Sequence, residues 1–248
     1  MNKYIAVFAL GMLAATTGWA QTAFHEVEVI TTNEPPMESL KFSRMQHKAC
    51  NLARQAKGLA PEPFPSIPQP RVLTREWTVS NGRDYVLRKR DYNIVPLDDG
   101  SETNSNCGWV YSWIEQITIS RGGRVTNINR NSDGPPEIEH NAYAIPWQLD
   151  NLRDYPLRRT IDGVALRCVP PAALASVTLL QPLKGVSESC IAERPAVFRD
   201  FSGDSLKLYI TLNANALGGQ YQVLTRFRNL RQVTPTAATW DPATYLRD

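Results

Sequence analysis

Residues 108–130 read GWVYSWIEQITISRGGRVTNINR. From Trp109 to Ile119 every second side chain is apolar or aromatic, with one exception, and this period is typical of a β-strand with one buried face. The Gly-Gly pair at 122–123 is a two-residue turn signal, so we expect the chain to return as a second strand. The stretch therefore predicts an antiparallel hairpin.

The exception on the apolar face is Glu115, a carboxylate that is costly to bury alone. A two-residue turn places Glu115 directly opposite Arg130, and a cross-strand ion pair supplies the missing partner. We therefore interpret Glu115 and Arg130 as a structural ion pair. The alternative is a catalytic carboxylate with a raised pKa.

Aromatic residues dominate the first strand of this hairpin. Trp109, Tyr111 and Trp113 share one face with Ile117 and Ile119. Because the rings alternate in register with aliphatic side chains, we expect them in the core. A sugar-stacking platform is the functional alternative.

Asn81-Gly82 indicates a second hairpin, since it lies between two β-rich runs. A two-residue turn there sets Arg75 opposite Arg88, with Arg90 further along the same face. Like charges in direct opposition are unfavourable unless an anion or an acid lies between them. Arg75, Arg88 and Arg90 are therefore the candidate binding site, for a carboxylate, a phosphate or an acidic partner surface. The competing interpretation is a solvated face, bridged by Asp84 or Asp91.

The remaining pattern is also rich in β-signals. Strands are predicted at residues 23–32, 71–79, 83–94, 164–169 and 176–180, with a third hairpin pairing 206–212 with 221–227 around Gly218-Gly219. One helix is predicted from Pro35-Pro36 to about Lys57, because apolar residues recur there at helical spacing. The expected fold class is mainly β, an antiparallel sandwich or barrel with one N-terminal α-helix, with α+β as the alternative.

The chain has 248 residues, 42% hydrophobic and 21% charged, which is ordinary for a globular protein and argues against a disordered or fibrous chain. Met1-Asn2-Lys3, an apolar run and the small residues Gly18 and Ala20 predict a signal peptide cleaved between Ala20 and Gln21. The expected division is residues 1–20 signal peptide, 21–58 strand and helix, 59–70 proline-rich connector, 71–234 antiparallel β domain and 235–248 tail. The mature chain is expected to be periplasmic or secreted, without a transmembrane segment.

Four cysteines follow the predicted signal peptide: Cys50, Cys107, Cys168 and Cys190. In an oxidising compartment an even number favours two disulfides. Spacing alone allows three connectivities, and we favour Cys50–Cys107 and Cys168–Cys190. No C-x-x-C motif supports a zinc site.

Motifs for enzymatic chemistry are sparse. No nucleophile elbow, phosphate-binding loop or dinucleotide fingerprint occurs. Glu137, Glu139 and His140 are the nearest approach to a metal cluster, but an extended chain points His140 away from the two acids. We predict no metal and no cofactor. The segment 133–162 has no clear period and reads as a long loop.

With 27 Lys+Arg against 24 Asp+Glu the net charge is +3, and removing the one lysine of the signal peptide leaves +2, so a nucleic-acid partner is not expected. We expect a non-enzymatic binding module for a protein partner in the cell envelope or outside the cell. The first alternative is a periplasmic carrier of an anionic or lipid-like molecule, which needs an apolar cavity. The second is a carboxylate-dependent hydrolase, which needs converging acids in a cleft.

Overall fold

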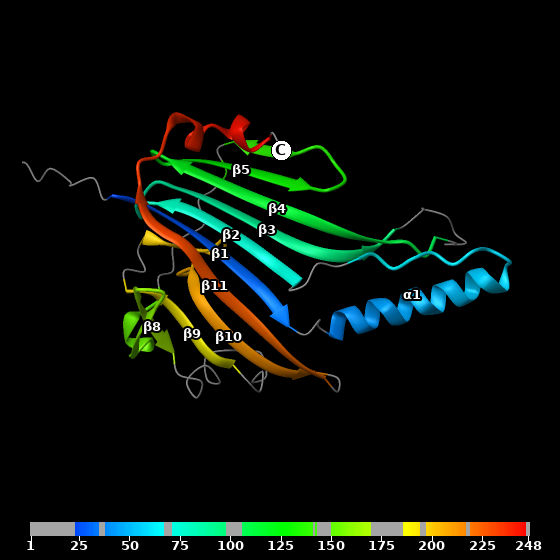
Figure 1. The fold of residues 1–248 in the computed structure, drawn as a ribbon. Helices are drawn as coiled ribbons and strands as arrows, with labels where there is room; N and C mark the ends of the chain where they lie inside the picture. The colour runs from blue at the N-terminus through cyan, green and yellow to red at the C-terminus, as the bar shows by residue number, and fades with distance from the viewer. Residues whose placement is uncertain are drawn as a thin grey trace, which may run out of the picture.

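The computed structural model describes residues 23–34, 38–66, 71–97, 106–140, 142, 150–169, 186–193, 197–216 and 219–246 (Figure 1). Within these residues, eleven antiparallel strands form one large sheet, accompanied by a single α-helix. This confirms the mainly β fold class with one helix. The predicted signal peptide (1–20) and the predicted strand at 176–180 lie outside the described residues.

The sheet consists of two meanders that meet at its centre. Its order is β6-β5-β4-β3-β2-β1-β11-β10-β9-β8-β7. The strands are β1 (Phe24–Glu34), β2 (Arg71–Ser80), β3 (Tyr85–Pro96), β4 (Trp109–Arg121), β5 (Arg124–Asn131), β6 (Glu137–His140), β7 (Leu157–Ile161), β8 (Val164–Val169), β9 (Val186–Ala192), β10 (Lys207–Ala216) and β11 (Gly219–Val233). The helix α1 (Glu38–Ala56) follows β1, and 3-10 turns occupy Leu152–Asp154, Ala237–Trp240 and Pro242–Tyr245.

The central strand is β1, which pairs with β2 on one side and with β11 on the other. Its Val27 and Val29 are buried. A strand hydrogen-bonded on both sides cannot be separated from its sheet without breaking two ladders. The N-terminal segment and the β-rich region from residue 71 onward therefore share one sheet.

Two of the three buried apolar clusters in the described part of the chain lie on opposite faces of the sheet. The first packs β1 against the C-terminal half and contains Val27, Val29, Leu166, Cys168, Cys190, Phe198, Leu206, Leu208 and Phe227. The second covers the other face of β3 to β5 and contains Val86, Ile117, Ile119, Ile128 and Tyr245, with Trp77, Trp240 and Leu246 against it. In Figure 1 the C-terminal segment lies over β4 and β5. The tail from residue 235 onward thus contributes Trp240 and Tyr245 to this second cluster.

The segment 133–162 is more regular than predicted. It contains β6 and β7, which are the two ends of the strand order. All four residues of β6 are exposed, and β7 buries none of its residues fully. Because neither strand has a buried face, neither shows the alternation on which the prediction relied. Asp162 and Gly163, both with positive φ, form the turn from β7 to β8. Asp-Gly is a two-residue hairpin signal, and it is the local feature of the sequence that indicates β7.

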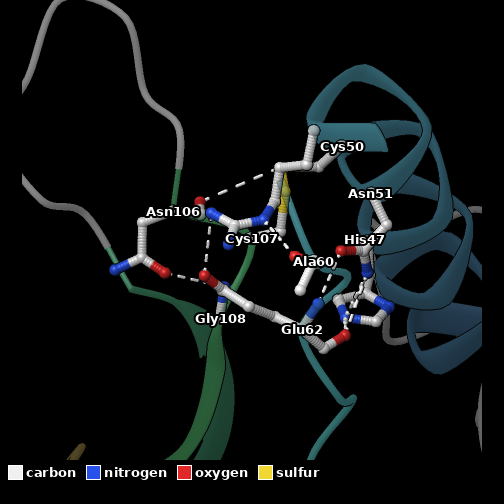
Figure 2. The surroundings of a disulfide bond; sticks show 9 residues. His47, Cys50, Asn51, Ala60, Glu62, Asn106, Cys107 and Gly108 are labelled. Atoms are coloured by element: carbon white, nitrogen blue, oxygen red, sulfur yellow. Dashed lines mark hydrogen bonds and ion pairs between the residues drawn. A yellow bond between two sulfur atoms is a disulfide. The ribbon is translucent and has the colours of Figure 1, made fainter. Parts of the chain in front are cut away.

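Both favoured disulfides are present. Cys168–Cys190 joins directly paired residues of β8 and β9 inside the first cluster. Cys50–Cys107 joins α1 to the residues just before β4, with a Cα–Cα distance of 5.6 Å (Figure 2). One disulfide thus lies within the sheet and the other ties the helix to it. Among the described residues, no helix has an apolar stretch long enough to cross a membrane.

Candidate functional site: an arginine pocket

The β2–β3 hairpin positions the three candidate arginines, but in a different register from the one predicted. Arg75 pairs with Arg90, and Trp77 pairs with Arg88. The prediction that Arg75 faces Arg88 is therefore wrong. The pairing ends at Ser80 and Tyr85, so the loop has four residues rather than two.

The side chain of Asn81 explains the longer loop. Its Oδ1 accepts hydrogen bonds from the backbone N–H of Arg83 at 2.9 Å and of Asp84 at 2.8 Å. The Asn81 N–H in turn donates to the carbonyl oxygen of Asp84 at 3.2 Å. These local bonds favour a four-residue turn. The longer turn moves the partner of each β2 residue two positions along β3, so Arg75 pairs with Arg90 instead of Arg88.

The β4–β5 hairpin has the predicted register, with Glu115 opposite Arg130 and Ile117 opposite Ile128. Arg130 Nη1 lies 3.2 Å from Glu115 Oε2. The Glu115 side chain is only 1% exposed, and that of Arg130 is 7% exposed. The carboxylate on the apolar face thus has the cross-strand partner that the pattern requires.

Glu115 also compensates two of the three candidate arginines. Its Oε1 accepts from Arg88 Nε at 2.7 Å and from Arg90 Nε at 2.9 Å. Neither Asp84 nor Asp91 takes the predicted bridging role: Asp84 accepts from the Gly122 N–H, and Asp91 pairs with Lys89. The predicted Glu115–Arg130 ion pair and the predicted arginine cluster therefore form one network around the buried carboxylate of Glu115.

Aromatic rings and the C-terminal segment complete this network. The Arg90 guanidinium lies 4.3 Å from the ring centre of Trp113, and Arg130 lies 5.5 Å from it. Arg130 Nη1 also donates to the carbonyl oxygen of Tyr245 at 2.8 Å. Burial lowers the pKa of Arg90, but the hydrogen bond and charge of Glu115 outweigh it and leave this pKa above its ordinary value. All these contacts favour charged guanidinium groups.

A pocket of about 300 Å³ opens beside the network. It is lined by Glu28, Arg75, Glu76, Trp77, Arg88, Arg90, Tyr92, Glu115 and Tyr245. The side chains of Arg88 and Arg90 are 38% and 24% exposed, and both bond to Glu115 through Nε. Arg90 also hydrogen-bonds to Tyr92. The Arg75 side chain is exposed and makes no hydrogen bond or ion pair with any residue that the structure describes. The pocket therefore brings together three arginines and three glutamates, and Arg75 is the arginine among them that has no bonded acid in the described residues.

The aromatic residues of β4 lie next to this pocket rather than in the core. Trp109, Tyr111 and Trp113 are half-buried, so the prediction of a core position is wrong. Tyr111 stacks on Tyr92 with ring centres 5.6 Å apart and planes inclined by 10°, and Trp109 packs on Phe64. Trp113 in turn lies against the guanidinium groups of Arg90 and Arg130.

A second hollow of about 250 Å³ lies between β3 to β5 and the loop after Phe198. Arg199 of that loop stacks over the ring of Tyr85 at 3.4 Å. Burial lowers the pKa of Arg199 to about 10. The loop of the C-terminal half thus packs across the face of the N-terminal meander.

Metal-ligating groups do not converge at either hollow. The one three-residue cluster found among the described residues is Cys168, Glu188 and Cys190, and its sulfur atoms are joined in a disulfide. Glu137, Glu139 and His140 are exposed on β6.

Comparisons with protein-family models, with curated proteins and with solved structures find no match for this chain. The function of the pocket is therefore argued from its geometry alone.

Proposed function

We propose that this chain is an exported binding protein that receives an acidic group of a protein partner in the arginine pocket. Two disulfides and a β-rich fold are compatible with a protein of an oxidising compartment. The predicted signal peptide would direct the chain there. The partner is a protein of the cell envelope or a secreted protein.

The observation that carries the proposal is the arginine pair Arg75 and Arg90. The two lie directly opposite each other, and Glu115 compensates only Arg90. Like charges in this position are unfavourable without an anion. A carboxylate placed between Arg75 and the guanidinium groups of Arg88 and Arg90 relieves that repulsion and forms charge-assisted hydrogen bonds.

The pocket fits a single acidic side chain or chain terminus better than the two alternative functions. A lipid-like cargo needs an apolar cavity, whereas three arginines and three glutamates line this one. A carboxylate-dependent hydrolase needs two acids that reach a substrate, and one of the three glutamates, Glu115, is buried beneath three guanidinium groups. A free dicarboxylate shares the chemistry of an acidic side chain and is distinguished by experiment.

The test is a calorimetric titration of the mature chain with a hexaglutamate peptide and, separately, with succinate. We expect the peptide to bind, and Arg75→Glu to weaken this binding at least about tenfold. Arg83→Glu, an exposed arginine in the loop of the same hairpin, is the matched control and should leave the binding unchanged.

Three outcomes contradict the proposal. Equal binding by the Arg75→Glu and Arg83→Glu variants shows that the pocket is not used. Succinate binding as tightly as the peptide identifies a small-molecule carrier. Binding that persists undiminished in high salt is inconsistent with recognition by exposed charges.

A further inference from the structure

The helix α1 packs with its polar side inward. His47 and Asn51 donate to the backbone carbonyl oxygen of Glu62 at 2.9 and 3.0 Å, and the Glu62 N–H donates to Asn51 Oδ1 at 2.8 Å. On the same side Arg54 forms an ion pair with Glu62 at 2.9 Å, and Cys50 is disulfide-bonded. Figure 2 shows His47 and Asn51 pointing from α1 toward the chain segment that follows it, and Cys50 joined to Cys107. From Met45 to Ala56 the helix is therefore held by polar and covalent contacts, whereas Leu40 near its start is buried.

The apolar side of α1 faces outward. Met45 is 62% exposed and Leu52 is 58% exposed, and Ala49 and Ala56 are also exposed. Spacings of four, three and four residues place Met45, Ala49, Leu52 and Ala56 on one stripe of the helix. We call these four residues the α1 seam. Apolar residues that the helical pattern would place against a core are thus presented to the outside.

Exposed apolar side chains are concentrated at this end of the molecule. Among the described residues, the exposed large apolar side chains are Met45, Leu52, Leu59, Val95, Leu97, Ile114 and Ile138. The first three lie on α1 or directly after it, and Val95 and Leu97 lie at the end of β3. Leu97 donates its N–H to Gly108, the neighbour of disulfide-bonded Cys107. Leu97 lies beside Gly108 and Glu62, on the side to which α1 is tethered, whereas Met45 and Leu52 project from the opposite side of the helix, where their exposure marks an interaction surface.

Charge identifies the kind of partner. The helix contains Lys41, Arg44, Lys48 and Arg54 but only one acid, Glu38, at its first residue. Lys48 directly precedes Ala49 of the seam, and it makes no ion pair with any described residue. An unpaired cation beside an apolar stripe complements a partner that places an acid beside its own apolar stripe.

We propose that the α1 seam docks an amphipathic helix of a partner protein whose apolar stripe is flanked by glutamate or aspartate. Ala49 and Ala56 allow the two backbones to approach closely, while Met45 and Leu52 supply the larger contacts. This surface uses no residue of the arginine pocket, so the proposal does not depend on that site. The tether to Cys107 and Glu62 holds the seam in place before the partner arrives, which lowers the entropy lost on binding.

Two other occupants fit less well. A membrane surface favours large apolar residues on the inserted side, and half of this seam is alanine. A second copy in parallel orientation brings Lys48 near Lys48 of the other copy, and four side chains bury much less area than a stable dimer requires. A helix with acidic flanks avoids the repulsion between lysines.

The test uses a fluorescent helical peptide of about three heptads, with leucine and alanine on one stripe and glutamate on both flanks. The same peptide with lysine flanks is the charge control. We expect the glutamate peptide to bind the full mature chain with a Kd of about 10–100 µM and the lysine peptide to bind at least about tenfold more weakly. Leu52→Gln should weaken binding of the glutamate peptide by a similar factor. Ile114→Gln, which removes an equally exposed apolar side chain from β4, should not.

Other results overturn the proposal. These are equal affinity for the two peptides, no loss of binding in Leu52→Gln, and no binding of the glutamate peptide at all. A chain that is dimeric in sedimentation and loses its dimer in Leu52→Gln assigns the seam to a second copy. Phosphatidylglycerol vesicles that bind the wild type but not Leu52→Gln assign it to a membrane. Arg75→Glu should leave peptide binding intact, which separates this surface from the arginine pocket.

Discussion

Arg75 and Arg90 lie directly opposite each other in the β2–β3 ladder, and only Arg90 has an acidic partner among the described residues. The partner, Glu115, comes from β4 and is buried. A buried carboxylate bonded to three guanidinium groups holds β3, β4 and β5 together at one point. The unpaired Arg75 is left at the rim of this network, facing the pocket.

The network should be sensitive to loss of its carboxylate. Glu115→Gln removes the one charge that Arg88, Arg90 and Arg130 share, and the buried Arg130 then loses this carboxylate. We expect the free energy of unfolding to fall by about 3–5 kcal/mol. Urea unfolding followed by tryptophan fluorescence measures this. Glu137→Gln on exposed β6 is the control and should change stability by less than about 0.5 kcal/mol.

Arg130 should matter for the C-terminal segment as well as for the sheet. Its Nη1 donates to the carbonyl oxygen of Tyr245, whose ring packs in the second apolar cluster. Arg130→Met keeps an apolar side chain at this position but removes the bonds to Glu115 and to the carbonyl oxygen of Tyr245. We expect lower stability and faster proteolysis after residue 234 than in the wild type. An Arg130→Met chain that melts like the wild type and resists cleavage equally would show that the ion pair carries no stability.

The two disulfides should differ in what they stabilise. Cys168–Cys190 lies in the first apolar cluster, whereas Cys50–Cys107 joins α1 to the start of β4. Replacing either pair by alanine should cost about 3–4 kcal/mol in the loop-entropy description. Hydrogen exchange separates the two effects. Removing the Cys50–Cys107 bond should increase exchange mainly at residues 38–66, and removing Cys168–Cys190 should increase it across β8 to β11. Identical exchange patterns would contradict this division.

Stability should depend on pH through Glu76. Burial raises the pKa of Glu76 from its ordinary 4.5 to about 7, with the charge of Lys89 opposing this and that of Asp200 adding to it. Because the folded chain holds this proton more tightly than the unfolded chain, the contribution to stability is complete below about pH 4.5 and is lost as the pH rises through about 7. Between pH 5 and pH 8 the free energy of unfolding should fall by about 2 kcal/mol more in the wild type than in Glu76→Gln. Parallel pH profiles of the two chains would contradict the shift.

Local patterns predicted a large part of this fold. Alternating apolar side chains identified β4 and β5, and Gly122-Gly123 set their register because the turn has only one length that fits. Asn81-Gly82 located the second hairpin but not its register, since the bonds of Asn81 lengthen the turn to four residues. Both disulfides join cysteines that are consecutive among the four in the chain, which is the connectivity that the sequence favours. Short, exposed strands such as β6 were not predicted, because a strand that buries no face shows no alternation of apolar and polar residues.

The sequence by itself determined the β-class, the helix and the pairing of Glu115 with Arg130, and it favoured the two disulfide pairs among three possible connectivities. The first three depend on residues close in the chain or joined by a short turn, where few geometries compete. Tertiary structure alone decided that Glu115 also binds Arg88 and Arg90, because a long connection separates β3 from β4 and leaves their register free. It also decided that α1 turns its apolar side outward. A helical period shows that one side is apolar, but contacts elsewhere in the chain, here those of Cys107 and Glu62, determine which side is packed.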